Sequence, residues 1–201
     1  MVRIFIEAKK EATSEFVFVK SYLAFLGIEK NLYEIVCVDG KDNLKNCRNK
    51  FAENTIEGGR NLVVFDADFP KTNGGFQTRR SDLLEQLKEM GAEADLFLFP
   101  NNADDGIFEN LLENLMLAEK HKQLLDCYHD YELCLGKDYV APNTKGKVFT
   151  YISSQKGLSN TQRNKLGSGQ WLFDNSLYWN LDCDYLRPFK EFLLTYLKEK
   201  K

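Results

Sequence analysis

Two carboxylates, Asp66 and Asp68, follow an apolar run at residues 61–65 and are separated by a single alanine. On an extended backbone, side chains two positions apart point the same way, so both carboxylates are expected to converge where the strand ends. Ligands of open α/β sheets gather at that end of the strands. Because converging carboxylates repel each other, a hard cation such as Mg²⁺ or Mn²⁺ would relieve the repulsion. The pair therefore predicts a divalent-cation site.

Further acidic residues are expected at the same edge. Glu7 ends a first predicted strand, and Asp104 and Asp105 follow the strand predicted at residues 95–99. The carboxyl ends of parallel strands share one edge of a sheet, so these groups should meet there. As alternatives, a lone Asp after a strand is a turn residue or helix cap, and Glu7 alone is an edge residue paired with a lysine. The predicted metal ligands are Asp66, Asp68, Asp105 and Glu109, which lies one turn into the next helix.

The elements that must position these residues alternate along the chain. Strands are expected at residues 3–8, 33–38, 61–65 and 95–99, with helical patterns between them. This order predicts an α/β fold with a mostly parallel sheet of about four strands flanked by helices. Residues 1–117 are expected to form that core. Residues 118–201 are expected to form an α-rich C-terminal extension packed on it as a single compact unit.

Several segments give weaker signals. Residues 69–80 are predicted to be a loop, with Ser81 capping the helix that follows. The stretch 147–152 fits a strand or a short helix, and 157–169 reads as a polar loop. An amphipathic helix is expected over 186–196.

Charge and composition narrow the function. The chain has 201 residues, 43% of them hydrophobic, and a formal net charge of -3. A protein that wraps a long duplex by charge alone is usually basic, so that class is disfavoured. Residues 136–170 nevertheless carry six basic side chains against one acidic, a local charge of +5. This segment is either a basic lobe that holds a phosphate backbone or a solvated loop region with scattered lysines.

The five cysteines are irregularly spaced and form no CxxC pair, which argues against a zinc ribbon and for free thiols. The first residues lack the apolar core of a signal peptide, and no apolar run is long enough to span a bilayer. A cytoplasmic protein without a membrane partner is the prediction. The oligomeric state is left open.

A glutamate after the first strand (Phe5-Ile6-Glu7-Ala8) and a D-x-D after a later apolar strand form a combination that resembles the Toprim domain of topoisomerases, primases and old-family nucleases. Small stand-alone Toprim-like proteins also share the stretch from Pro100 to Glu109. The resemblance implies that Glu7 transfers protons and that the D-x-D binds Mg²⁺. Lys9, beside Glu7, is added as a catalytic candidate that contacts phosphate. The implied function is a Mg²⁺-dependent nuclease or related phosphodiester chemistry on nucleic acid.

Two departures from the family pattern keep alternatives open. Ala8 replaces the usual glycine, so the backbone there is less free to approach a phosphate, and Glu11 stands where an aspartate is common. One alternative is a non-catalytic Toprim-like protein with a binding or regulatory role. Another is a metal-dependent nucleotide-sugar glycosyltransferase, which explains the D-x-D but gives Glu7 no role.

Overall fold

A parallel four-stranded sheet in the order β2-β1-β3-β4 forms the centre of the computed structural model, which describes residues 1–197. The strands are β1 (Val2–Ile6), β2 (Tyr33–Cys37), β3 (Arg60–Asp66) and β4 (Asp95–Phe99). The central strands β1 and β3 are almost wholly buried, as expected for a parallel sheet covered on both faces. In the register of the sheet, Ile6 lies opposite both Cys37 and Val64. The predicted α/β fold is confirmed.

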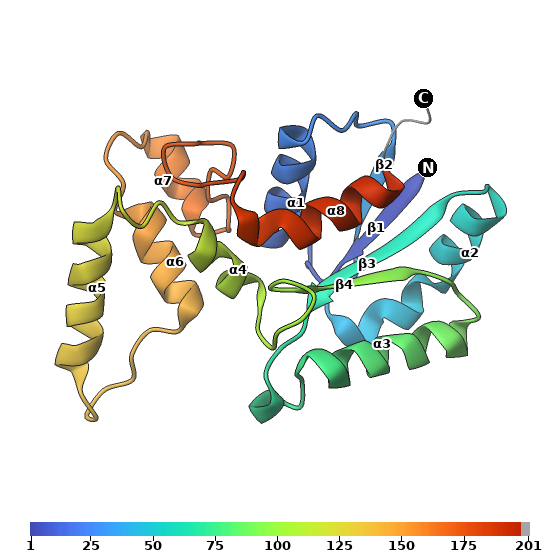
Figure 1. Cartoon of the computed structure of the whole chain (residues 1–201), viewed down its shortest axis with the longest axis horizontal. Helices are drawn as coiled ribbons and strands as arrows, with labels where there is room; N and C mark the ends of the chain where they lie inside the picture. Colours follow the sequence, from blue (N-terminus) through green and yellow to red (C-terminus); the bar gives the residue numbers. More distant parts are fainter. Residues whose placement is uncertain (198–201) are drawn as a thin grey trace.

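Helices cover both faces of the sheet (Figure 1). One face carries α1 (Ser14–Phe25) and α8 (Arg187–Tyr196), and the other carries α2 (Arg48–Ile56) and α3 (Phe76–Met90). Phe18 and Phe189 pack together in the first hydrophobic cluster. In the second cluster, the rings of Phe5 and Phe51 stack with their centroids 3.8 Å apart. Two apolar layers therefore hold the strands in place and leave only the ends of the sheet for polar groups.

The C-terminal half is rich in helix. It contains α4 (Phe108–Leu115), α5 (Lys122–Leu135), α6 (Thr144–Ser153) and α7 (Asn160–Leu166). In Figure 1, α5, α6 and α7 lie together beyond the carboxyl ends of the strands, beside α4. Val148 and Trp171 belong to the same hydrophobic cluster as Phe18, while the division at residue 117 stays a prediction. Within residues 1–197, no helix has the length and apolar character needed to cross a bilayer.

Two helices begin where a loop was predicted. Helix α3 starts at Phe76 rather than after Ser81, because Asp105 from a distant loop accepts the Phe76 N–H at 2.6 Å. Helix α7 lies inside the predicted loop 157–169, and Ser159 and Gln162 form a capping box at its start. Residues 147–152, left open between strand and helix, belong to α6. Short 3₁₀ helices η1 (Lys41–Cys47), η2 (Pro70–Thr72) and η3 (Asp184–Leu186) occur in connecting segments.

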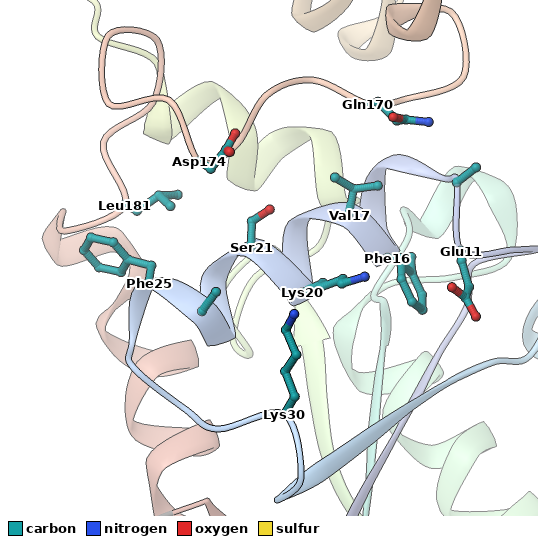
Figure 2. Close-up of a pocket in the computed structure, with 12 residues that line it drawn as sticks. Glu11, Phe16, Val17, Lys20, Ser21, Phe25, Lys30, Gln170, Asp174 and Leu181 are labelled. Carbon is teal, nitrogen blue, oxygen red and sulfur yellow. The ribbon is translucent and has the colours of Figure 1, made fainter.

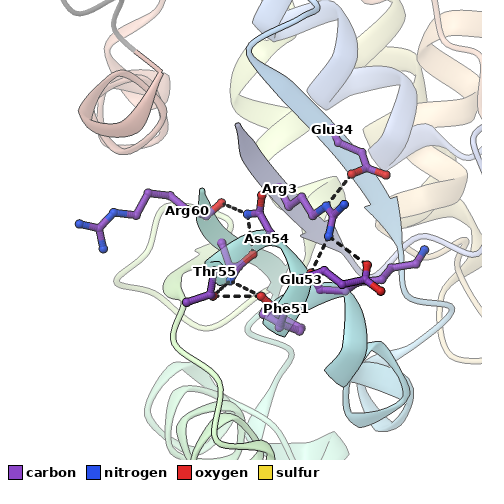
Figure 3. Close-up of polar contacts among 9 residues, drawn as sticks. Arg3, Glu34, Phe51, Glu53, Asn54, Thr55 and Arg60 are labelled. Carbon is purple, nitrogen blue, oxygen red and sulfur yellow. Dashed lines mark hydrogen bonds and ion pairs between the residues drawn. The ribbon is translucent and has the colours of Figure 1, made fainter. Parts of the chain in front are cut away.

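The amino-terminal end of the sheet is closed by paired polar groups (Figure 3). Arg3 Nε donates to Glu34 Oε2 at 2.6 Å, and Arg3 Nη1 donates to the Lys50 carbonyl at 2.7 Å. The amide of Asn54 donates to Asn61 Oδ1 and to the Arg60 carbonyl, both at 2.9 Å. These contacts fix the start of β1 and β3 and leave the opposite end of the strands as the candidate site.

Candidate functional site

Glu7 and Asp66 lie at the carboxyl ends of the adjacent strands β1 and β3. Asp66 Oδ1 accepts the backbone N–H of Phe108 at 2.8 Å, at the first residue of α4. The next residue, Glu109, is buried with 7% of its surface exposed. Glu15, in the first turn of α1, completes the group. We call Glu7, Glu15, Asp66 and Glu109 the acidic cluster.

The acidic cluster is held together against its own charge. Burial raises the pKa of Asp66 well above its usual range, and the charges of Glu15, Glu7 and Glu109 raise it further. Burial, followed by the charges of Glu7 and Glu109, raises the pKa of Glu15 to about 7, and Lys145 opposes this shift. Mutual repulsion of this kind is the signature of carboxylates that share one site. The cluster therefore takes up positive charge, as protons or as a cation.

Glu7 has a free oxygen that faces away from water. Its Oε1 accepts the Lys41 N–H at 3.3 Å, while its Oε2 is buried without a hydrogen-bond partner. Burial and then the charge of Asp68 raise the pKa of Glu7, while the backbone N–H of Asp66 and the charge of Arg79 lower it. A buried carboxylate oxygen without a partner is costly, so a proton, a water or a ligand at Oε2 would stabilise this arrangement.

Asp68 departs from the prediction that it would point the same way as Asp66 on extended backbone. Its φ of 60° places it in the left-handed region, and its backbone exchanges two hydrogen bonds with Gly106, at 2.7 and 2.9 Å. Its carboxylate forms an ion pair with Arg79, which is 2% exposed. The extended backbone ends at Asp66, because Asp68 is hydrogen-bonded to the loop that contains Gly106. The expectation that Asp66 and Asp68 would point the same way on extended backbone was therefore wrong. The two aspartates have different partners, and Glu7 lies within reach of the charge of both.

Asp105 and Lys9 lie outside the acidic cluster. Asp105 caps α3 through the Phe76 N–H, and Lys9 is exposed in the loop after β1. Their predicted roles as metal ligand and catalytic residue stay predictions. Arg79 is buried and paired with Asp68.

Glu15 is the member of the cluster that the sequence reading missed. Its signal was its place in the first turn of the helix that follows β1, since that turn starts at the carboxyl edge of the sheet. Acidic residues are common in the first turn of a helix because they interact favourably with the helix dipole. This position therefore did not by itself identify Glu15 as a member of the acidic cluster.

The acidic cluster contains oxygen atoms that could bind a cation, but it does not form a complete set of metal ligands. Over residues 1–197, no set of three or more His, Cys, Asp or Glu side chains is arranged to hold a metal ion. Magnesium sites commonly use one or two carboxylates, with waters and phosphate oxygens as the remaining ligands. Asp66, Glu109 and Glu7 carry oxygen atoms of the kind that Mg²⁺ prefers, but they are not arranged as a set of three ligands.

Known proteins give no independent guide to this site. No family model matches the chain, and comparison with curated proteins and with solved structures found no match.

Proposed function

We propose that this protein catalyses divalent-cation-dependent chemistry on the phosphodiester bonds of a nucleic acid, at the carboxyl edge of its sheet. The observation that carries the proposal is the burial of Asp66 beside Glu15, Glu7 and Glu109. Burial and then these charges raise the pKa of Asp66 well above its usual range. Burying like charges together is expensive, and such arrangements concentrate at functional sites. The Toprim resemblance of Glu7 and the D-x-D sequence agrees with this proposal and stays part of it.

In this proposal Asp66 and Glu109 would hold Mg²⁺ or Mn²⁺. The bound cation supplies positive charge that stabilises charge developing on the phosphodiester. Glu7 holds or releases a proton at Oε2, and its raised pKa brings it closer to neutral pH, where acid–base catalysis is efficient. Arg79 fixes Asp68 and adds positive charge beside Glu7.

A nucleic-acid substrate is supported by two lysines of α6 that pair with glutamates of α4. Lys145 Nζ lies 3.8 Å from Glu109 Oε1, and Lys147 Nζ lies 2.8 Å from Glu113 Oε1. The basic segment recognised in the sequence therefore borders the acidic cluster. A phosphate backbone that crosses this border would meet lysines on one side and the cation ligands on the other.

A second candidate function, a non-catalytic binding protein, is favoured by the protein contacts of the D-x-D. Asp66 already accepts a backbone hydrogen bond, and Asp68 already has a buried arginine partner. In that case the edge binds a cation or a phosphate without cleaving it.

Cleavage of end-labelled single-stranded and duplex oligonucleotides with Mg²⁺ or Mn²⁺ tests the proposal. We expect cleavage by the wild type, none by Asp66→Asn or Glu7→Gln, and full activity for Ser21→Ala on the outer side of α1. Glu7→Gln should still bind Mn²⁺. If the wild type binds the cation but does not cleave, the non-catalytic candidate is favoured. If it neither binds the cation nor cleaves, the proposed cation site is contradicted.

A further inference from the structure

A cavity of about 440 Å³ lies next to the acidic cluster. It opens between the start of α1, helix α6 and the loop after α7, and its wall includes Thr13, Ser14, Lys145, Phe149, Ser168 and Gly169. Lys145 also forms the ion pair with Glu109, and Ser14 precedes Glu15, so the cavity and the cluster share a border. Its volume is within the usual range for a small-molecule pocket.

The start of α1 faces this cavity without a side-chain cap. Thr13 stands at the cap position, but its hydroxyl donates to the Lys10 carbonyl instead of accepting from the helix. The first N–H groups of a helix have no partners within the helix, and they favour an anion. Helix α1 has 12 residues, so its dipole adds to that preference.

Ser14 is an independent sign of a ligand. It is only 6% exposed, it lines the cavity, and within residues 1–197 its hydroxyl takes part in no hydrogen bond. Among the described residues, the Ser14 hydroxyl is not one of the buried polar atoms that are cut off from solvent without a partner, so it is open to the cavity, where a ligand can reach it. Gly169 completes the cradle, because a Cβ there would lie 2.6 Å from the Ser14 nitrogen and its φ is +88°. The loop can approach the helix start this closely only with glycine.

Helix α6 supplies a charge and an aromatic ring at positions one turn apart. The Lys145 side chain is 63% exposed, and Phe149 is 41% exposed, although both line the cavity. Residues four apart share one face of a helix. A cation beside an exposed aromatic ring suits a nucleotide, whose phosphate pairs with the lysine while its base stacks on the ring.

We propose that this cavity binds one nucleotide unit of a nucleic-acid strand. The phosphate lies against Ser14 and the start of α1 with Lys145 beside it, and the base stacks on Phe149. As a substrate subsite this rests on the proposed function above, since it would hold a strand next to the acidic cluster. Binding of the nucleotide itself does not depend on a cation.

A larger cavity of about 660 Å³ on the outer side of α1 serves as the internal comparison (Figure 2). Lys30 points toward α1, the Lys20 ammonium lies 5.8 Å from the centroid of the Phe16 ring, and Ser21 lies above both lysines. The wall of this cavity also contains the carboxylates Glu11 and Asp174, so its charges balance, and it lies along the body of α1 rather than at its start. It therefore lacks the features that select an anion.

The test is a titration of the ¹⁵N-labelled full chain with 5′-dTMP, inorganic phosphate and thymidine, in EDTA. We expect dTMP and phosphate to shift the amide signals of Ser14, Gly146 and Ser168. Ser14→Ala should weaken binding of both about tenfold, because it removes a hydrogen bond to a charged group. Phe149→Ala should weaken the binding of dTMP about fivefold and leave the binding of phosphate unchanged. The matched control Ser21→Ala, on the same helix but in the larger cavity, should change neither.

Ser14→Ala should fold normally, because losing an unpartnered buried hydroxyl is nearly neutral. Signal shifts around Lys20 and Lys30, equal effects of Ser14→Ala and Ser21→Ala, or no response at millimolar dTMP would each overturn the proposal. Because EDTA removes divalent cations, a failure here leaves the cation chemistry of Asp66 standing. Conversely, Asp66→Asn should abolish cleavage and leave dTMP binding intact.

Discussion

At the amino-terminal end of the sheet, Arg3 meets Glu34 at 2.6 Å and the buried amide of Asn54 donates to that of Asn61. At the carboxyl end, by contrast, three carboxylates surround a fourth, Asp66. The same strands connect both ends. In the part of the chain that the structure describes, each end leaves one buried oxygen without a partner, Asn54 Oδ1 at the first end and Glu7 Oε2 at the second. The two ends therefore differ in charge, because only the second buries like charges together. Buried like charge lowers stability, and such arrangements concentrate at functional sites, which is why our proposal places the ligand at the carboxyl end.

The largest effect is expected at the amino-terminal end. Asn61→Ala removes an amide that donates to the Phe51 carbonyl and the Thr55 hydroxyl and accepts from Asn54. We expect the free energy of unfolding in urea to fall by about 3 kcal/mol, since buried partners are left unpaired. Asn49→Ala, on the exposed side of α2, should change it by less than about 0.5 kcal/mol. Equal effects would show that this network is not what stabilises the end.

The carboxyl end should respond with the opposite sign. The pKa of Glu15 is about 7 in the folded protein against an ordinary value of 4.5, so folding favours its neutral form. Without cations, wild-type stability should fall as the pH rises from about 4.5 to about 7, because the folded protein then holds a proton that the unfolded chain has lost.

Glu15→Gln removes this penalty. We expect it to raise the free energy of unfolding by about 2 kcal/mol at pH 8, allowing for water at the partly exposed side chain, and to have little effect at pH 4. Urea unfolding in EDTA at both values measures the difference. Equal stabilisation at the two pH values would show that the charge of Glu15 is not the cause.

A smaller effect separates capping from metal binding at the same edge. Asp105→Ala should lower the free energy of unfolding by about 1 kcal/mol, because it removes the acceptor for the Phe76 N–H. Asp104→Ala, at the neighbouring exposed position, is the control and should cost less. If Asp105→Ala instead weakens Mn²⁺ binding and leaves stability unchanged, Asp105 belongs with the cation ligands.

The strands could be predicted from the sequence because each is a short apolar run between turn residues, a pattern that can be recognised without knowing the distant residues with which it pairs. Local signals also place Glu7 and Asp66 at one edge. The start of α3 could not be found in this way, since its cap comes from Asp105 in another loop. The conformation of Asp68 likewise depends on Gly106 and Arg79. By contrast, α7 was missed although its Ser159–Gln162 capping box is a local pattern.

The most direct test of the central claim is Mn²⁺ binding followed by electron paramagnetic resonance at pH 8. The wild type is compared with the Asp66→Asn, Glu109→Gln double variant, in which both side chains keep their shape and lose their charge. We predict one site in the wild type and at least tenfold weaker binding in the variant, which should also unfold at higher urea because repulsion is relieved. Equal Mn²⁺ affinity in the two proteins would contradict a cation site at the acidic cluster.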